Sequence, residues 1–415
     1  MLQLSERDDA MMRGAFGAGV ARAMRIVART ADVMSAPHLI DIASAHIDGC
    51  LYHGRTSVDF VEYFVDTGAK VAVPTTLNVG SLDLIHPELY RGDRAIERDA
   101  RRLMDAHLQL GCEPSFTCAP YQLKNRPAQG EQIAWAESNA IVFANSVLGA
   151  RTSRYGDFLD LAAAITGRAP YAGLHVEANR AARIVFNAPD FGRLPSRDIH
   201  FAALGLLIGK VAGAIVPAIV GLPPDTTEDE LKALGAAAAS SGAVALFHAV
   251  GVTPEAPTLD AALHGRAAQR TIDVTIADLD AIRRTLNHGA AGDALAAVAL
   301  GTPHFSLAEF RALDALLDAF DGRPKCDVYV NTSRFILWQL DELGLAGKFA
   351  ARGVQIVVDT CTYITPVMKQ LAGLVMTNSA KWASYAPANI GVAVAYGSLR
   401  ECVRSAFEGR VRFDD

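Results

Sequence analysis

Residues 326–366 read CDVYVNTSRFILWQLDELGLAGKFAARGVQIVVDTCTYITP. The apolar run VYV ends in the polar residues NTS, and the apolar run at 354–358 ends in Asp359, Thr360 and Cys361. Between the two runs, apolar residues recur at the three- and four-residue spacing of a helix. A strand, a helix and a second strand in this order are typical of a parallel sheet that helices cover on both faces.

The same alternation of strands and helices recurs along the chain, so the sequence predicts an α/β fold with parallel or mixed sheets flanked by helices. The predicted strands outside this stretch include 38–47, 70–74 and 243–250. The predicted helices include 5–31, 93–111 and a segment that begins at Glu137.

Composition excludes several classes of protein. The 415 residues are 51% hydrophobic and 20% charged, which is a folding composition, and a net charge of -6 argues against nucleic acid as a partner. The apolar run 201–222 contains Lys210, which would cost roughly 2.5–3.5 kcal/mol at a bilayer centre, so we expect a buried helix or strand pair and no membrane span. Six cysteines in a chain of this length do not indicate a disulfide framework, and we expect a cytoplasmic protein.

The loops that follow the predicted strands should meet at one sheet edge, where α/β proteins bind ligands. These loops are ASAHIDG, PTTLN, FTCAPY, GTPHFS, VNTSR, VDTCTY and MTNSAKW. They are rich in Ser, Thr, Asn, His and Cys and almost free of carboxylates, which predicts a site for a polar, anionic small molecule. No GxGxxG follows a strand, and GxxxxGK[ST], HExxH, GxSxG and CxxC are absent, so the common nucleotide, zinc-protease, hydrolase and dithiol motifs are missing.

Three cysteines come from distant segments that could converge on this edge. Cys118 and Cys361 lie in two of the loops, and Cys402 lies near the C-terminus. Three such thiolates could hold an iron–sulfur cluster with one iron open to substrate. Two alternatives stay open: the cysteines pack as small apolar residues, or they hold a structural zinc in a non-catalytic binding module.

Six longer stretches make the chain resemble the large catalytic subunit of aconitase X, a branch of the aconitase superfamily. They are ASAHIDGCLYHG, VPTTLNVGSLD, TCAPYQ, GEQIAWAESNAIVFANSVLGARTSRYG, VVDTCTYITPVM and VMTNSAKWASYAPAN. The resemblance covers residues 40 to 405 and implies an aconitase-like arrangement of lobes, approximately 1–200 and 201–415, with the site at the lobe interface. NSAKWASY departs from the family pattern, which usually has a histidine there, and this affects the expected substrate.

The resemblance implies a hydro-lyase with an iron–sulfur cluster, either [2Fe–2S] or [3Fe–4S]/[4Fe–4S], bound by Cys118, Cys361 and Cys402. The expected substrate is a small hydroxy acid: cis-3-hydroxy-L-proline, which gives 1-pyrroline-2-carboxylate, or alternatively mevalonate 5-phosphate. No segment resembles the small swivelling domain that carries the catalytic serine of aconitases. The resemblance therefore implies a heterodimer with a separate small subunit.

The matching motifs also supply candidate catalytic and substrate-binding residues. Lys381 and Arg151 are expected to hold the substrate carboxylate, and His46 is expected to act as a general acid or a supporting hydrogen-bond donor. Hydroxyl and amide groups in the same motifs could orient the substrate: Thr75, Thr76, Asn78, Ser138, Asn139, Asn378 and Ser379. Surface charges, helix caps and a structural histidine would have the same sequence pattern.

Overall fold

The computed structural model describes residues 2–194 and 196–414, and these form two compact units. Unit 1 contains residues 1–81, 93–181 and 253–255, and unit 2 contains residues 82–92, 182–252 and 256–415. The division follows Ala181, whereas the sequence analysis places it at residue 200, inside helix α7 (Arg197–Ala212). Helix α7 is apolar, like much of unit 2, so composition alone does not reveal the boundary between the two units.

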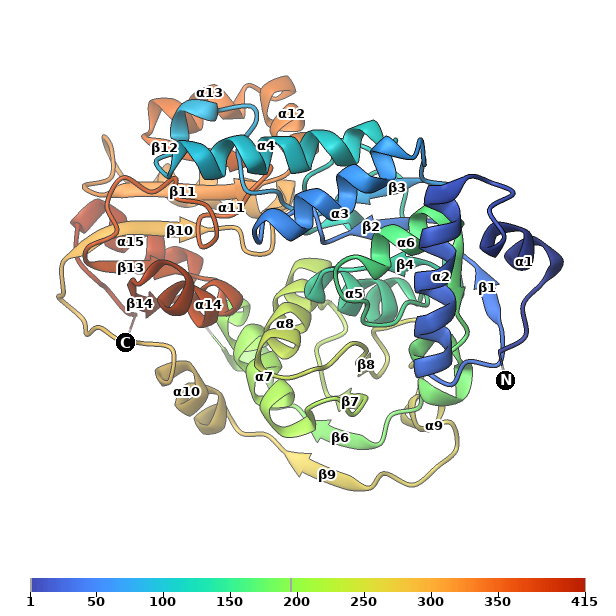
Figure 1. The fold of residues 1–415 in the computed structure, drawn as a ribbon. Helices are drawn as coiled ribbons and strands as arrows, with labels where there is room; N and C mark the ends of the chain where they lie inside the picture. Colours follow the sequence, from blue (N-terminus) through green and yellow to red (C-terminus); the bar gives the residue numbers. More distant parts are fainter. Residues whose placement is uncertain (1, 195, 415) are drawn as a thin grey trace. The chain divides into compact units, whose positions relative to one another are not determined.

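Unit 1 is built on a three-stranded parallel sheet in the order β3-β2-β4, with a separate antiparallel pair β1-β5 (Figure 1). Its strands are β1 (Leu39–Asp41), β2 (Ala45–Ile47), β3 (Thr75–Leu77), β4 (Ala134–Trp135) and β5 (Arg168–Pro170). Its helices are α1 (Glu6–Met12), α2 (Ala18–Val33), α3 (Arg55–Asp66), α4 (Arg94–Gln109), α5 (Ser138–Phe143) and α6 (Leu159–Thr166). A turn of π-helix, Ala144–Leu148, extends α5, so the predicted helix after Glu137 is confirmed.

Unit 2 contains two parallel sheets, in the orders β8-β7-β6-β9 and β12-β11-β10-β13-β14. The first is formed by β6 (Ile184–Asn187), β7 (Pro217–Val220), β8 (His248–Ala249) and β9 (Arg270–Asp273). The second is formed by β10 (Leu295–Leu300), β11 (Asp327–Thr332), β12 (Val354–Val358), β13 (Leu374–Thr377) and β14 (Ala393–Tyr396). The helices of this unit are α7, α8 (Glu228–Ser241), α9 (Leu259–Leu263), α10 (Ile276–Arg284), α11 (Leu307–Leu317), α12 (Arg334–Glu342), α13 (Leu345–Ala351), α14 (Ala380–Ile390) and α15 (Leu399–Glu408).

The stretch 326–366 forms the predicted strand–helix–strand pattern as β11, α12, α13 and β12, and the parallel α/β class is confirmed. In the five-stranded sheet the chain proceeds outward from β10 to β11 and β12, and then returns to β13 on the other side of β10. The point between β10 and β13 is therefore a topological switch point, where α/β folds bind ligands beyond the carboxyl ends of the strands.

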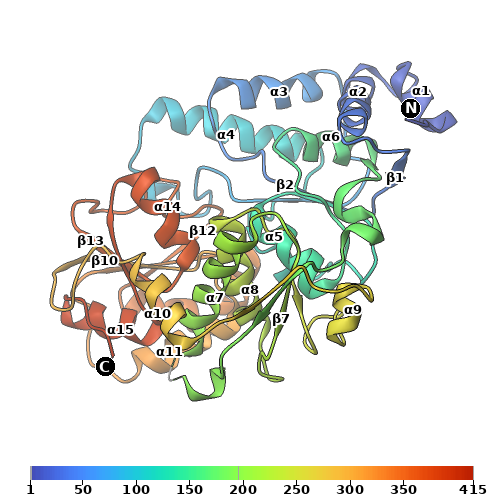
Figure 2. The same cartoon turned by 90° about the horizontal axis from the view of Figure 1, so that it is seen from below.

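The predicted strand 70–74 is wrong, because the strand β3 begins at Thr75, and only two residues of 243–250 form a strand. The apolar run 201–222 forms most of α7 and then β7, and α7 and α8 pack side by side (Figure 2). A Cβ atom at Gly205 would lie 2.1 Å from the carbonyl oxygen of Leu234, so only glycine permits this close approach. Within the described residues, no helix is both long enough and apolar enough to cross a membrane.

Candidate functional site

The carboxyl ends of the three parallel strands of unit 1 carry polar side chains on one face. His46 pairs in register with Thr76 on β3 and with Trp135 on β4. Because side chains alternate along a strand, the residues two positions later share this face. We call the five polar residues the edge cluster: His46, Asp48, Thr76, Asn78 and Glu137. Two direct contacts lie within the cluster: Asn78 Nδ2 donates to the Asp48 carboxylate, and His46 Nδ1 lies 2.8 Å from Thr76 Oγ1. Glu137 acts on His46 and Asp48 through its charge.

His46 is neutral, and one of its ring nitrogens is unprotonated. The Thr76 hydroxyl donates to the Ala45 carbonyl at 3.4 Å, so its oxygen accepts the proton on His46 Nδ1. The other nitrogen, Nε2, then carries a lone pair, and it is buried without a hydrogen-bond partner among the described residues. Burial lowers the pKa of His46 to about 3, although the charge of Glu137 opposes this shift. This arrangement favours an accepting role for Nε2, and the predicted role of His46 as a general acid or supporting hydrogen-bond donor stays a prediction.

The edge cluster is acidic, contrary to the prediction of an edge almost free of carboxylates. Burial, together with the nearby carboxylates Glu137, Asp157 and Asp160, raises the pKa of Asp48 to about 8. Asp160 is fully buried, and burial raises its pKa to about 7 although it accepts hydrogen bonds from the backbone N–H groups of Asp48 and Gly49. The sequence analysis missed these acids because each stands alone in its motif, as in HIDG and AES. Only the strand register brings them together.

Glu137 occupies a strained backbone position at the end of β4. Its φ of 69° lies in the left-handed region, and its side chain is buried. Its carboxylate accepts the Ala140 N–H at 2.7 Å and the Ser138 hydroxyl at 3.2 Å. Strain of this kind in a buried, non-glycine residue is concentrated at functional sites. The predicted residue Ser138 is thus oriented by the carboxylate beside it.

The loop that carries Cys118 lies along β3 in unit 1. Thr117 N–H donates to the Leu77 carbonyl at 2.9 Å, so the loop continues the sheet beside the edge cluster. Asn139 donates to the Cys118 carbonyl at 2.7 Å and accepts from the Tyr121 hydroxyl at 3.1 Å. Both ends of this amide are used inside the protein, so Asn139 supports the cysteine loop. Thr75 likewise donates its hydroxyl to the Val73 carbonyl at 2.8 Å and lies on the opposite face from Thr76.

Arg151 is placed away from the edge cluster. It forms an isolated parallel bridge with Gln132, which precedes β4, whereas Glu137 follows the other end of that strand. Its guanidinium forms an ion pair with Glu177. This ion pair at the amino end of the strand gives no support for a contact with the substrate carboxylate, and that role of Arg151 stays a prediction.

In unit 2, Asp359 shapes the loop that carries Cys361. Asp359 is fully buried with a φ of 63°, and it accepts two hydrogen bonds from Arg334, at 2.5 and 2.7 Å. Burial raises the pKa of Asp359, and the Arg334 charge opposes that shift. The backbone N–H of Leu84 donates to the same carboxylate at 3.1 Å. This ionic anchor fixes the turn by which the chain leaves β12 immediately before the cysteine.

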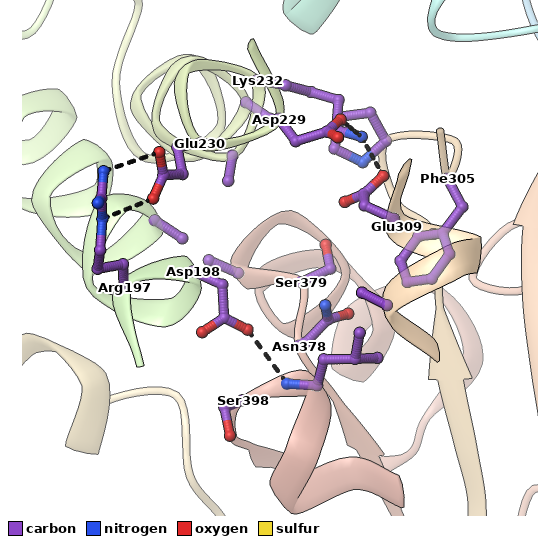
Figure 3. A pocket seen from close by; sticks show the side chains of 18 of the residues that line it. Arg197, Asp198, Asp229, Glu230, Lys232, Phe305, Glu309, Asn378, Ser379 and Ser398 are labelled. Atoms are coloured by element: carbon purple, nitrogen blue, oxygen red, sulfur yellow. Dashed lines mark hydrogen bonds and ion pairs between the residues drawn. The ribbon is translucent and has the colours of Figure 1, made fainter. Parts of the chain in front are cut away.

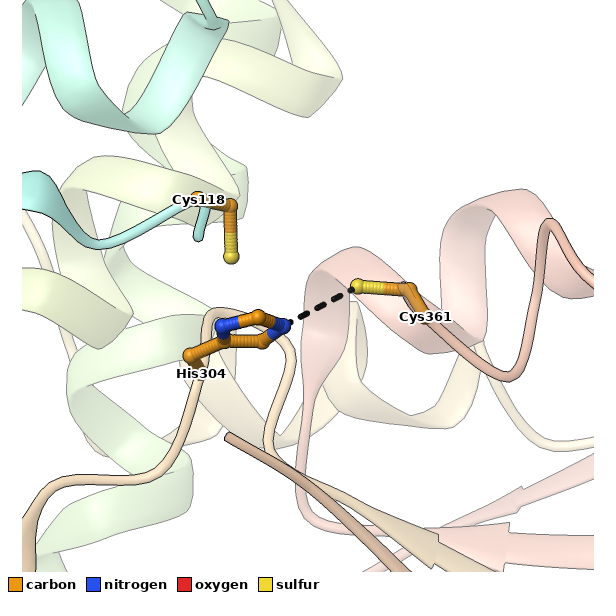
Figure 4. A group of neighbouring side chains, drawn as sticks. All are labelled: Cys118, His304 and Cys361. Carbon is orange, nitrogen blue, oxygen red and sulfur yellow. Dashed lines mark hydrogen bonds between the residues drawn. The ribbon is translucent and has the colours of Figure 1, made fainter. Parts of the chain in front are cut away.

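His304 and Cys361 form a buried pair of metal-type donors in unit 2 (Figure 4). His304 Nε2 lies 3.8 Å from the Cys361 sulfur and 3.3 Å from the Thr360 carbonyl oxygen. Asn331 connects the two loops, since its amide donates to the Leu300 carbonyl at 2.8 Å and accepts from the Thr362 N–H at 3.1 Å. Thiolate and imidazole are donors that iron prefers, so these residues fit a metal or cluster. Cys118, drawn in the same figure, belongs to unit 1.

Cys402 does not accompany Cys361. It packs in the apolar core of the five-stranded sheet with neighbours such as Val403 and Phe407. Its thiol donates to the Gly397 carbonyl at 3.8 Å, and burial raises the pKa of the thiol well above its ordinary value. A metal ligand must be a thiolate, which this environment disfavours. The structure therefore offers no support for Cys402 as a ligand, and that assignment stays a prediction.

A cavity of about 460 Å³ lies within unit 2 beyond the carboxyl ends of β10, β13 and β14 (Figure 3). The predicted residues Asn378, Ser379 and Lys381 line it together at the start of α14. The Ser379 hydroxyl donates to the Thr302 carbonyl and accepts the Trp382 N–H, so it shapes the wall. The cavity occupies the topological switch point, the position expected for a ligand in this type of sheet.

A buried ionic group forms the opposite wall of this cavity. Lys232, on α8, pairs with Asp229 at 2.8 Å and with Glu309 (Figure 3). Its ammonium also donates to the backbone carbonyl of His304 at 3.4 Å. The sequence analysis missed both His304 and Lys232. The loop GTPHFS and the capping pattern at 227–230 were visible, but nothing in the sequence indicates that the two segments meet.

Comparison with known proteins gives consistent matches along the chain. Residues 1–178, 182–284 and 295–408 match the first, second and third domains of aconitase X. The chain is 41% identical to cis-3-hydroxy-L-proline dehydratase of Hypocrea jecorina and 43% identical to that of Pseudomonas aeruginosa, over 98% of this chain and 69% and 70% of theirs. It is 35% identical to the phosphomevalonate dehydratase large subunit of Methanothermobacter thermautotrophicus, over 97% of this chain and 98% of that subunit.

The fold matches a solved structure as well. The crystal structure of Thermococcus kodakaraensis aconitase X in its holo-form superposes with a TM-score of 0.87 at 31% sequence identity, and the match covers 97% of this chain and 100% of that one. The three domain matches, the relatives above 40% identity and this superposition agree. The chain belongs to the aconitase X family.

Proposed function

We propose that this chain is the large subunit of an iron–sulfur-dependent hydro-lyase that dehydrates cis-3-hydroxy-L-proline to 1-pyrroline-2-carboxylate. The observation that carries the proposal is the identity of 41–43% to two proteins of that name, against 30–35% to the five phosphomevalonate dehydratase large subunits. The acidic edge cluster supports the same choice. Mevalonate 5-phosphate carries a carboxylate and a phosphate, and both would be repelled by buried acids.

Cys118 and Cys361 are the proposed cluster ligands, and the His304 imidazole is a further donor beside Cys361. Both cysteines are buried, neither forms a disulfide, and both lie on loops that other side chains hold in place. When bound, a cluster with an open iron supplies Lewis-acid assistance to the departure of hydroxide.

The remaining chemistry falls to the protein's own groups. Lys381 and Asn378, at the cavity wall, are proposed to hold the substrate carboxylate and to stabilise the charge that develops on it when the α-proton leaves. Thr76 and Asn78 are proposed to orient the substrate at the edge cluster, and Ser138 to donate a hydrogen bond there. Asn139, Thr75 and Ser379 act indirectly, because their polar groups fix the loops that carry these residues.

The proposal includes a separate small subunit that completes the site. The chain spans 69–70% of the two hydroxyproline dehydratases but 98% of the Methanothermobacter protein, whose name designates it a large subunit. None of the six cysteines, all of which the structure describes, forms a disulfide; this suits a reducing compartment, and we propose a cytoplasmic location.

The test is an assay of the chain co-purified with its small partner under anaerobic conditions with iron. Dehydration of cis-3-hydroxy-L-proline, with no turnover of mevalonate 5-phosphate, is the expected result. Turnover of mevalonate 5-phosphate alone would contradict the substrate assignment. An iron-free, colourless protein with full activity would contradict the cluster.

A further inference from the structure

The edge cluster of unit 1 contains two buried acceptors that have no partner. His46 Nε2 and Asn78 Oδ1 make no hydrogen bond within residues 2–194 and 196–414. His46 is 0% exposed and Asn78 is 3% exposed, so water at the surface does not donate a hydrogen bond to either acceptor. A buried acceptor without a donor costs about 1–3 kcal/mol, and such atoms mark a place where a ligand donates.

Acids gather at Asp48: burial and the neighbouring carboxylates Glu137, Asp157 and Asp160 raise its pKa to about 8, so without a bound cation the Asp48 carboxyl keeps its proton at neutral pH. Asn78 Nδ2 is its neutral hydrogen-bond donor. Asp48 remains partly exposed, so a ligand can reach it. Buried carboxylates need a counter-charge, and an arriving cation would supply it.

The arrangement suits an ammonium group better than a metal ion. Among the described residues, the imidazole and the two carboxylates of the edge cluster do not lie close enough together to form a three-ligand metal site. An ammonium instead donates separate N–H bonds to acceptors that lie apart. The edge cluster offers a ring nitrogen, an amide oxygen and carboxylates, all of which accept.

We propose that the edge cluster binds the ring ammonium of the substrate and thereby selects a cyclic amino acid over a hydroxy acid that lacks nitrogen. The inference rests on the proposed function and deepens it. A site built to receive an N–H group rejects analogues without one, because its buried acceptors are then left unpaired. Mevalonate 5-phosphate has no amine, so it would leave His46 Nε2 and Asn78 Oδ1 unsatisfied and place more negative charge near Asp48.

The test compares two competitive inhibitors of the assembled, iron-loaded enzyme with its small subunit. L-proline carries the ring ammonium, and cyclopentanecarboxylate has a methylene in its place. We expect the wild type to bind L-proline at least about 100-fold more tightly. Asp48→Asn and Glu137→Gln, which keep side-chain size and an acceptor oxygen, should each reduce this ratio at least about tenfold. The matched control Asp59→Asn removes an exposed carboxylate of α3 and should leave the ratio unchanged.

The outcomes separate this inference from the proposed function. If the wild type dehydrates cis-3-hydroxy-L-proline but binds the two inhibitors equally, the inference is overturned and the proposed function stands. This outcome is measured on the wild type, so it does not depend on whether a variant folds. An unchanged ratio in both folded variants overturns it too. A wild type that does not dehydrate cis-3-hydroxy-L-proline overturns the proposed function and the inference together.

Discussion

The ammonium of Lys232 donates to the backbone carbonyl of His304 at 3.4 Å. The same ammonium is 3% exposed and pairs with Asp229 and Glu309. Glu309 in turn accepts the Ser306 N–H at 2.8 Å, in the capping box of α11. A buried charge on α8 therefore holds both ends of the short segment in which His304 faces Cys361.

Replacement of Lys232 by Met should destabilise the protein strongly. Removal of the cation leaves two carboxylates without their partner in a buried place, which costs about 3–5 kcal/mol. Denaturant unfolding, followed by circular dichroism, measures the change. The exposed ion pair of Lys348 with Asp314 and Asp318 provides the control, and Lys348→Met should cost less than about 1 kcal/mol. Equal losses in the two variants would show that Lys232 contributes no more than a surface charge.

Serine variants of the three cysteines predicted to bind the cluster should differ in their visible absorbance. Cys118→Ser and Cys361→Ser should each abolish the visible absorbance of the anaerobically purified enzyme, its bound iron and its activity, because serine is a poor ligand for iron–sulfur clusters. Cys402→Ser should keep colour and iron, since its thiol faces the apolar core. It should instead lose stability, because a hydroxyl replaces an apolar sulfur. Loss of iron in Cys402→Ser, with the fold intact, would restore it as a ligand.

The two cations expected at the substrate carboxylate should behave differently. Lys381→Met should raise KM for cis-3-hydroxy-L-proline at least about tenfold, because a charge-assisted hydrogen bond contributes about 1.5–3 kcal/mol. Arg151→Gln should change KM less than about threefold, since Arg151 pairs with Glu177 at the amino end of β4. Steady-state kinetics on the assembled enzyme measures both. The reverse order of effects would show that Arg151 reaches the substrate.

The α/β class and the polar ends of the strands could be predicted because both depend on local pattern. The run at 354–358 forms β12 with the predicted bounds, and Cys361 follows it as expected. The helix α15 that carries Cys402 was not among the predicted elements, although Cys402, Val403, Ala406 and Phe407 all lie on its buried face.

The edge cluster could not be predicted, because it depends on which strands are neighbours. Asp48 and Glu137 are 89 positions apart in the chain. Only the parallel register of β2 with β4 brings them to one face of the sheet. The same holds for Lys232 and His304, which lie on α8 and on the loop after β10. A pattern along one strand gives the face of a side chain but not its neighbour across the sheet.

The pH dependence of stability should report the buried proton on Asp48. Its pKa rises to about 8 in the folded protein, from an ordinary value of 3.8, so the folded state binds a proton that the unfolded state has released throughout this interval. The free energy of unfolding must therefore fall as pH rises toward 8, and Asp48→Asn removes this contribution. Unfolded histidine, with an ordinary pKa of 6.5, releases its remaining proton across pH 6.5 to 8, but His46 is present in both proteins, so its contribution cancels when their losses of stability are compared. The wild type should lose on the order of 1 kcal/mol more stability across this window than Asp48→Asn, measured by urea unfolding at both pH values. Parallel pH profiles for the two proteins would show that Asp48 is already ionised in the fold.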